Sequence, residues 1–222
     1  MSTLSGFRSM DFLEQVTLLN DISARKDSAA LPELLDLFET PTGDKGVDYM
    51  VVNALNTVLG ANEDAVIDGL GSPKANFRTL CIRAAGEYAF PDAAEPLMHM
   101  AEDEEDPDLL LEVLAALAKI QPAGAAAVFR TFLGHDDAML AALAMEMAGV
   151  YGDTQAVPFL RAAVEATDAH RSLDQCDITT WKAIDALAAM ATPEAVAFLA
   201  SCVHHQNPTA RRLITDALIR IG

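Results

Sequence analysis

The sequence predicts an all-α protein, a right-handed α–α superhelix (solenoid) of about six helical-hairpin repeats. Apolar residues recur at the spacing of an amphipathic helix in most segments. A two-helix pattern also recurs at a step of roughly 30 residues, which is typical of helical repeat proteins. The composition is 51% hydrophobic but only 6% aromatic, as close packing between alanine- and leucine-rich helices requires.

The clearest repeat lies at residues 136–167. The apolar stripe of its first helix consists of Leu140, Leu143, Ala144, Met147 and Val150. Gly149 and Gly152 weaken the end of this helix, where a left-handed residue is needed. Asp153 is expected to cap the second helix. Because Pro158 lies too far past that cap for a first-turn proline, it either bends the second helix or moves its start later.

Copies of this unit are recognised by the residues that begin the second helix. The pattern there is a small residue, then proline or another small residue, then an apolar pair. The leading residues are Ala30, Ala65, Ala94, Ala125, Ala156 and Ala195, at steps of 35, 29, 31, 31 and 39 positions. One such hairpin cannot bury its own apolar face, so neighbouring hairpins must stack into a continuous core.

Two phrases resemble short HEAT-like repeats of the type found in phycobiliprotein lyases. They are residues 82–88 followed by 91–97, and residues 147–153 followed by 156–160. The resemblance covers residues 12–222 and implies a single HEAT/ARM-like repeat domain over residues 1–222. It implies no one function, because scaffolds, lyases and hydroxylases share such repeats. The central glycine of the family is replaced within residues 119–121 and 189–191, and its basic residue appears only in places, as at Arg78 and Arg211.

In chain order, residues 1–11 are expected to form a loose N-terminal arm. The first helix of the first hairpin begins at Phe12, and its partner helix is predicted at residues 31–38. Residues 40–46 carry a dense turn signal. The next hairpins are predicted at residues 47–59 with 63–70, 77–90 with 92–101, and 109–120 with 122–133.

Residues 102–108 contain six acids in seven positions. We expect a solvated loop whose carboxylates favour the positive start of the next helix. An acidic contact for a basic partner is the alternative. A calcium loop is rejected because the glycine for its sharp turn is missing and the spacing is wrong.

The repeat step lengthens at an irregular loop, residues 168–177, that contains His170, Asp174 and Cys176. A metal site or a Cys–His pair is one hypothesis here, but there is no second pair of ligands at metal-site spacing. Trp181 is expected to anchor this loop against the next helix. His135 is expected to be a surface loop residue, and the adjacent pair His204–His205 points to different helix faces, which makes a poor metal site.

The last helix opens at Asn207 and has no partner before Gly222. Its uncovered apolar side would either pair with another subunit or be covered by something else, so self-association through the C-terminal helix is expected. This helix is also locally basic, through Arg211, Arg212 and Arg220.

The net charge of −18 disfavours nucleic acid and anionic membrane surfaces as partners. Residues 1–111 hold 7 basic and 21 acidic side chains, whereas residues 112–222 hold 8 and 12. We therefore expect the acidic half to meet either a protein partner with a basic surface or the basic tail of a second copy. Three cysteines without a CxxC pair, no signal peptide and no membrane-spanning run predict a cytoplasmic protein.

The sequence thus predicts a non-enzymatic scaffold or adaptor with no catalytic, cofactor or metal residues. The alternative is a lyase-like or chromophore- or cofactor-handling protein of the same fold. An iron-dependent hydroxylase of this fold would need His–Glu pairs, and no histidine here is followed by Glu. A HEAT-like DNA glycosylase would need a basic, aromatic groove, which an acidic chain with one tryptophan does not offer. Candidate exposed residues on the second helices are Met98, His99, Arg130, Arg161 and Glu165.

Overall fold

The computed structural model describes residues 4–167 and 177–222. Within these ranges every regular element is helical, so the all-α prediction is confirmed. The α-helices are α1 (Phe12–Arg25), α2 (Leu31–Glu39), α3 (Lys45–Leu59), α4 (Glu63–Leu70), α5 (Ala75–Glu87), α6 (Ala94–Asp103), α7 (Pro107–Ile120), α8 (Ala125–Thr131), α9 (Ala138–Tyr151), α10 (Val157–Glu165), α11 (Ile178–Met190), α12 (Pro193–Ser201) and α13 (Pro208–Ile221). The 3-10 helices in the same ranges are η1 (Phe7–Ser9), η2 (Ser28–Ala30), η3 (Pro91–Ala93) and η4 (Thr154–Ala156).

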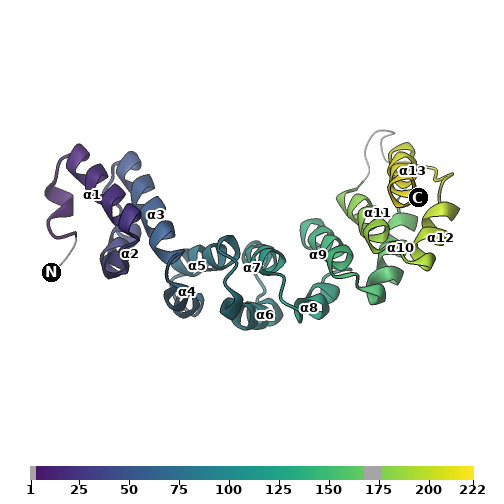
Figure 1. Cartoon of the computed structure of the whole chain (residues 1–222), viewed down its shortest axis with the longest axis horizontal. Helices are drawn as coiled ribbons and strands as arrows, with labels where there is room; N and C mark the ends of the chain where they lie inside the picture. Colours follow the sequence, from purple (N-terminus) through teal and green to yellow (C-terminus); the bar gives the residue numbers. More distant parts are fainter. Residues whose placement is uncertain (1–3, 168–176) are drawn as a thin grey trace. The chain divides into compact units, whose positions relative to one another are not determined.

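The chain divides into two compact units, residues 1–97 and 98–222, and the division falls within α6. In the first unit α1 and α2 pack on α3, and α4 packs on α5 (Figure 1). In the second unit α9 packs on α11, α8 on α9, and α10 on α11. A second helix therefore packs on the first helix of the following hairpin, which confirms the predicted repeat fold. The single domain over residues 1–222 stays a prediction.

The second helices α2, α6 and α10 begin after a short 3-10 turn. Asp153 caps η4 by accepting a hydrogen bond from the Gln155 N–H at 3.1 Å. Pro158 then lies in the first turn of α10, where its missing N–H costs no helical hydrogen bond. Pro32 has the same place in α2, after η2. Of the two predicted effects of Pro158, the later start is therefore the correct one.

The helices α1, α7, α9 and α11 each end on a residue in the left-handed region, whether or not the sequence supplies glycine there. Gly152 ends α9 with φ of 61°, as the sequence predicts. The family's glycine is missing at the ends of α7 and α11, and there Gln121 and Ala191 adopt φ of 53° and 47°. A side chain at such a φ costs free energy, so the tight turn between hairpin helices must outweigh it.

The N-terminal segment is packed over its described residues, so the predicted loose arm is wrong there. Leu4 and Phe7 are only 6% and 2% exposed. The Gln15 side-chain amide donates to the Phe7 carbonyl at 2.9 Å, and the Leu4 N–H donates to Glu33. The burial of Leu4, in the turn before η1, and of Phe7, in η1, offsets the entropy of ordering the segment.

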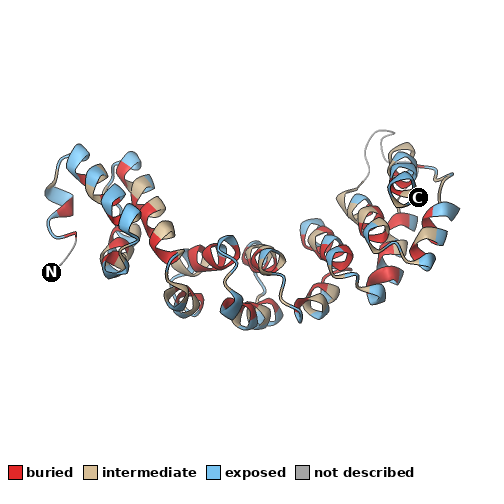
Figure 2. Cartoon of the chain, viewed as in Figure 1, coloured by how far each residue is buried: buried red, intermediate tan, exposed pale blue. Residues whose placement is uncertain are grey.

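Two small residues, Gly149 and Ala186, set the spacing between the first helices α9 and α11 of the second unit. A Cβ built on Gly149 of α9 would lie 2.8 Å from the Ala186 Cα of α11. The two helices therefore approach more closely than larger side chains permit. Figure 2 shows the buried residues on the sides of helices that face their neighbours. Among the described residues, no helix combines the length and apolar character needed to cross a bilayer.

Candidate protein-interaction surface

The second helices of the first unit carry charge of one sign. Together α2 and α4 contain six carboxylates and neither Lys nor Arg. These residues, which we call the acidic face, are Glu33, Asp36, Glu39, Glu63, Asp64 and Asp68. The Lys and Arg side chains of the same unit lie on η1, on first helices or in turns. In the first unit, the second helices α2 and α4 therefore carry only negative charge, and the positive charges lie on other elements. The overall composition does not reveal this separation.

Half of the acidic face is engaged within the protein. Glu33 Oε2 accepts the Leu4 N–H at 2.5 Å, Glu39 pairs with Lys74, and Glu63 Oε1 accepts the Asp92 N–H at 3.1 Å. The other three are exposed and have no side-chain partner among the described residues: Asp36, Asp64 and Asp68. These three carboxylates are free to meet an external cation.

Two of the free carboxylates lie where the helix itself disfavours them. Asp36 and Asp68 are in the last turns of α2 and α4. The partial negative charge at a helix C-terminus repels a carboxylate there. Helix stability therefore does not explain why these positions are acidic.

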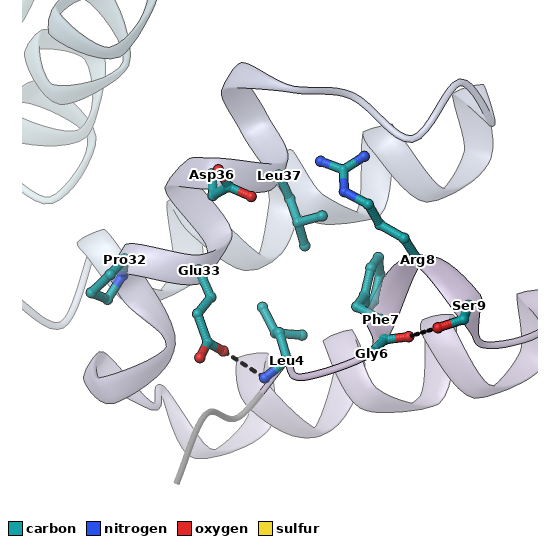
Figure 3. Close-up of a pocket in the computed structure, with 9 residues that line it drawn as sticks. All are labelled: Leu4, Gly6, Phe7, Arg8, Ser9, Pro32, Glu33, Asp36 and Leu37. Carbon is teal, nitrogen blue, oxygen red and sulfur yellow. Dashed lines mark hydrogen bonds between the residues drawn. The ribbon is translucent and has the colours of Figure 1, made fainter.

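Two hollows flank α2. The first, of about 420 Å³, is the α2 pocket: Leu4, Gly6, Phe7, Arg8, Ser9, Pro32, Glu33, Asp36 and Leu37 line it. In Figure 3 the apolar side chains of Leu4, Phe7 and Leu37 lie between Glu33 on one side and Arg8 on the other. The second hollow is lined by Phe38, Glu39, Pro41, Lys74, Ala75, Asn76 and Phe77. Both hollows open beside residues of the acidic face.

A carboxylate on α3 fixes the turn between α2 and α3. Asp48 accepts hydrogen bonds from Thr42 Oγ1 and Thr42 N, each at 2.7 Å, and from Gly43 N at 3.3 Å. Desolvation raises the pKa of Asp48, but these hydrogen bonds and the nearby Arg8 outweigh it and hold the pKa below its ordinary value of 3.8. The turn that carries Thr40 and Pro41 is therefore held in place.

The predicted candidates on later second helices lie in different surroundings. Arg130 Nε is 2.7 Å from Asp153 Oδ2, and the Arg161 guanidinium lies 4.8 Å from the centre of the Phe198 ring. Met98 is half-buried beside Gly124, whereas His99 and Glu165 are exposed. Both arginines thus have partners within the second unit. The helices α8, α10 and α12 together carry two positive charges, Arg130 and Arg161, and two negative charges, Glu165 and Glu194. Their net charge is therefore zero.

Part of the acidic run at residues 102–108 is engaged in forming its own turn. Glu104 Oε1 accepts the N–H groups of Glu105 and Asp106, and Asp106 Oδ1 accepts the N–H of Asp108 at the start of α7. The predicted solvated loop is confined to residues 104–106, because Glu102 and Asp103 end α6 and Asp108 is in the first turn of α7. Glu102, Asp103 and Glu105 remain exposed.

The histidines before α9 and α13 have structural roles. His135 Nδ1 accepts the Asp137 N–H, and His205 Nδ1 accepts the Asn207 N–H, each at 3.0 Å. His205 Nε2 also lies 3.2 Å from the Val164 carbonyl oxygen, and His204 is exposed. No group of three or more His, Cys, Asp or Glu side chains within the described ranges is placed to hold a metal ion. His170, Asp174 and Cys176 lie outside those ranges, as does nearly all of the predicted loop 168–177.

The described cysteines and Trp181 offer no catalytic set. Burial raises the pKa of Cys81 to about 12, so its thiol stays protonated and unreactive at neutral pH. Cys202 is half-buried beside Ser201. Trp181 is exposed next to Lys182. Its predicted anchoring of the 168–177 loop stays a prediction.

The C-terminal helix has one exposed apolar side chain for the predicted self-association. It buries Ala210, Ile214 and Ala217, while Ile219 is 73% exposed. Arg220 pairs with Asp185 at 2.7 Å, which leaves Arg211 and Arg212 exposed on the same helix. Self-association stays a prediction.

The α2 pocket was not predicted from the sequence. Its floor depends on η1 lying against α2, and residues 1–11 were expected to be loose. The available signal was the spacing of Leu4 and Phe7, which places both on one side of a helical turn.

Comparisons with known proteins identify the repeat type. Residues 63–145 match the family model described as HEAT repeats. A search among curated proteins gave no match. Among solved structures, human deoxyhypusine hydroxylase in complex with glycerol is similar, with 17% identity, a TM-score of 0.46, and coverage of 94% of this chain and 79% of that one. The complex of CpcE and CpcF of phycocyanin lyase from Nostoc sp. PCC7120 has 17% identity and a TM-score of 0.44, with coverage of 99% and 93%. Similarity at this level assigns neither a reaction nor a partner to this chain.

Proposed function

This chain is a HEAT-like repeat protein, and on that premise we propose that it is a non-enzymatic scaffold that binds a protein with a basic surface. The acidic face on α2 and α4 is the binding surface. Stacked hairpins place successive second helices beside one another, so carboxylates from different repeats act on one partner. The same proposal places the protein in the cytoplasm, where Cys81 and Cys202 stay as free thiols.

The observation that carries the proposal is the placement of Asp36, Asp64 and Asp68. They are exposed, have no partner among the described residues, and share two helices with no Lys or Arg. Solubility alone would be served by carboxylates anywhere on the surface. Two of the three instead lie at helix C-termini, where they cost stability, and such a cost is typical of residues kept for binding.

The test uses a fluorescein-labelled oligolysine peptide and fluorescence anisotropy with the full chain. We expect binding that weakens steeply between about 50 mM and about 200 mM salt, because exposed charges are screened over roughly 10 Å. Neutralising the three free carboxylates (Asp36→Asn, Asp64→Asn, Asp68→Asn) should lower the affinity about tenfold, which is a coupling of about 1.4 kcal/mol.

A matched control makes the same charge change on the acidic run. The variant Glu102→Gln, Asp103→Asn, Glu105→Gln removes three exposed carboxylates from the second unit. We expect its affinity to stay within about twofold of the wild type, because the proposal gives these carboxylates no contact with the peptide and salt screens their charge. An equal loss of peptide affinity in the two variants would overturn the acidic face as the binding surface. A wild-type chain that does not bind the peptide would overturn it as well.

The alternative of chromophore or cofactor handling is checked on the same preparation. An absorbance scan and native mass spectrometry of the purified chain would reveal a bound chromophore or small molecule. A stoichiometric bound group would replace the scaffold proposal, whereas the mass of the bare chain is the result that the scaffold proposal expects.

A further inference from the structure

The α2 pocket differs from the rest of the acidic face because it is hollow and apolar. We propose that it is the anchor site of the basic partner: it takes one large apolar side chain of a peptide segment, while a neighbouring Lys or Arg reaches Asp36. This inference rests on the proposed scaffold function and adds the chemistry that selects the partner. Charge on the open face favours any cation, whereas the pocket requires an apolar residue beside it.

The floor of the pocket is built for an apolar group. Leu4, Phe7 and Leu37 form it, and each is almost completely buried. The volume of about 420 Å³ is within the range of ligand sites, roughly 300–1,000 Å³. A Phe or Leu side chain that leaves water for such a floor gains free energy in proportion to the apolar area removed from water.

Hydrogen bonds hold both walls of the pocket before any partner arrives. On one side, Glu33 accepts the Leu4 N–H at 2.5 Å (Figure 3). On the other, the Arg8 guanidinium donates to the Thr40 carbonyl, to Thr40 Oγ1 at 2.6 Å and to the Pro41 carbonyl at 3.4 Å. A peptide that enters a held pocket does not have to order it, so less affinity is lost on binding.

Two carboxylates and one guanidinium give the rim a net charge of −1, and the group without a partner among the described residues is a carboxylate. Three charged side chains line the pocket: Arg8, Glu33 and Asp36. The Arg8 guanidinium is directed at Thr40 and Pro41, and the Glu33 carboxylate at Leu4. Asp36 alone on this rim has no partner among the described residues. A Lys or Arg beside the anchor side chain therefore finds one free carboxylate on α2.

The second hollow beside α2 lacks this combination. It is lined by Phe38 and Phe77, but Glu39, its only carboxylate, is already paired with Lys74. It therefore offers apolar surface without a free negative charge. The difference identifies the α2 pocket as the site that matches an apolar residue and a cation together.

The test compares two short synthetic peptides on the full chain. One has a central Phe between pairs of Lys, and its twin has Ser in place of Phe. We expect the Phe peptide to bind the wild type about tenfold more tightly, since seating one large apolar side chain is worth at least that factor. In methyl NMR spectra, only the Phe peptide should shift the methyl signals of Leu4 and Leu37.

Variants locate the effect. Ser9→Trp places a large side chain at a lining position of the pocket and should abolish the advantage of the Phe peptide, whereas Ser5→Trp, also exposed but not a lining residue, should leave it unchanged. Asp36→Asn should weaken both peptides and cost the Phe peptide more. Asp68→Asn, on α4, should weaken both equally.

Each outcome separates this inference from the function on which it rests. Equal binding of the two peptides, with loss in the triple carboxylate variant, would overturn the anchor pocket and leave the scaffold proposal standing. Failure of both peptides to bind would overturn both. An equal effect of Ser5→Trp and Ser9→Trp would overturn the pocket. So would concentration-dependent shifts of the Leu4 and Leu37 methyl signals without peptide, because a second copy would then occupy it.

Discussion

Arg130 Nε lies 2.7 Å from Asp153 Oδ2 and so joins α8 to the turn between the two helices of the following hairpin, α9 and α10. The Asp153 side chain is only 7% exposed, whereas that of Arg130 is 29% exposed. The same carboxylate also accepts the Gln155 N–H. One aspartate therefore caps η4 and links two hairpins of the second unit.

Removing Arg130 should destabilise the protein more than removing an exposed arginine. Arg130→Ala leaves the buried Asp153 carboxylate without its cation, which we expect to lower the free energy of unfolding by about 1–3 kcal/mol. Arg25→Ala, whose partner Asp21 is on the same helix and exposed, should cost less than about 0.5 kcal/mol. Urea unfolding followed by circular dichroism measures both; equal losses would contradict the role of the buried link.

Local signals in the sequence were sufficient for most of this region. Gly152 and Asp153 each act within one turn of the chain, so their roles follow from residue type. The sequence left two effects of Pro158 open, and the presence of η4 before α10 decides between them. The predicted apolar stripe of α9 is confirmed for Leu140, Ala144 and Met147, which are buried, but it is wrong for Val150, which is 53% exposed at the end of the helix. The hairpin repeat could therefore be predicted before any tertiary contact was known.

The acidic face could not be predicted in the same way. Its carboxylates are visible in the sequence, but Glu33 and Glu39 are engaged by Leu4 and Lys74, which lie 29 and 35 positions away. Only the folded chain separates these from the free Asp36. The α2 pocket depends on the packing of η1, whose short apolar pair does not by itself reveal which helix it meets.

Two helices that end on a left-handed residue allow a stability test. Substitutions at these two positions should change the free energy of unfolding in opposite directions. Ala191 has φ of 47° at the end of α11, and Gly152 has φ of 61° at the end of α9. Ala191→Gly should raise the free energy of unfolding by about 0.5–1 kcal/mol, because an alanine side chain is strained there and glycine is not. Gly152→Ala should lower it by about 1 kcal/mol. The same sign for both substitutions in thermal or urea unfolding would contradict this explanation.

The Asp48 carboxylate should make the free energy of unfolding depend on pH in the acidic range. Its folded-state pKa is below the ordinary 3.8, so the unfolded chain binds a proton more readily than the folded one. Its contribution is therefore fully present above the ordinary pKa and is lost as the pH falls through the lowered folded value. Asp48→Asn should be less stable than the wild type at pH 7, and the difference should shrink as the pH falls below 3.8. A difference that is constant with pH would show that the carboxylate charge is not involved.

Cys81 should react with thiol reagents only when the first unit opens. Burial raises its pKa to about 12, and its sulfur is enclosed between α4 and α5 close to Gly69. In a Cys176→Ser, Cys202→Ser background, we expect labelling by a maleimide to be slow at neutral pH and to become fast in urea. Fast labelling of the native protein would mean that α4 and α5 separate readily. A Cys81→Ser, Cys176→Ser variant reports on the half-buried Cys202 as the comparison and should label faster.

The contact between Gly149 and Ala186 should limit how far the second unit tolerates larger side chains. A methyl group at position 149 would lie 2.8 Å from the Ala186 Cα, which is backbone and cannot rotate away. Gly149→Ala should therefore destabilise the protein by about 1–3 kcal/mol, even though alanine is the better helix former, because α9 and α11 must move apart. Gly134→Ala is the matched control, since a Cβ there meets nothing within 4 Å, and it should be close to neutral. If Gly149→Ala proved stabilising in urea unfolding, helix propensity would outweigh the contact, and the close approach of α9 and α11 would not depend on glycine.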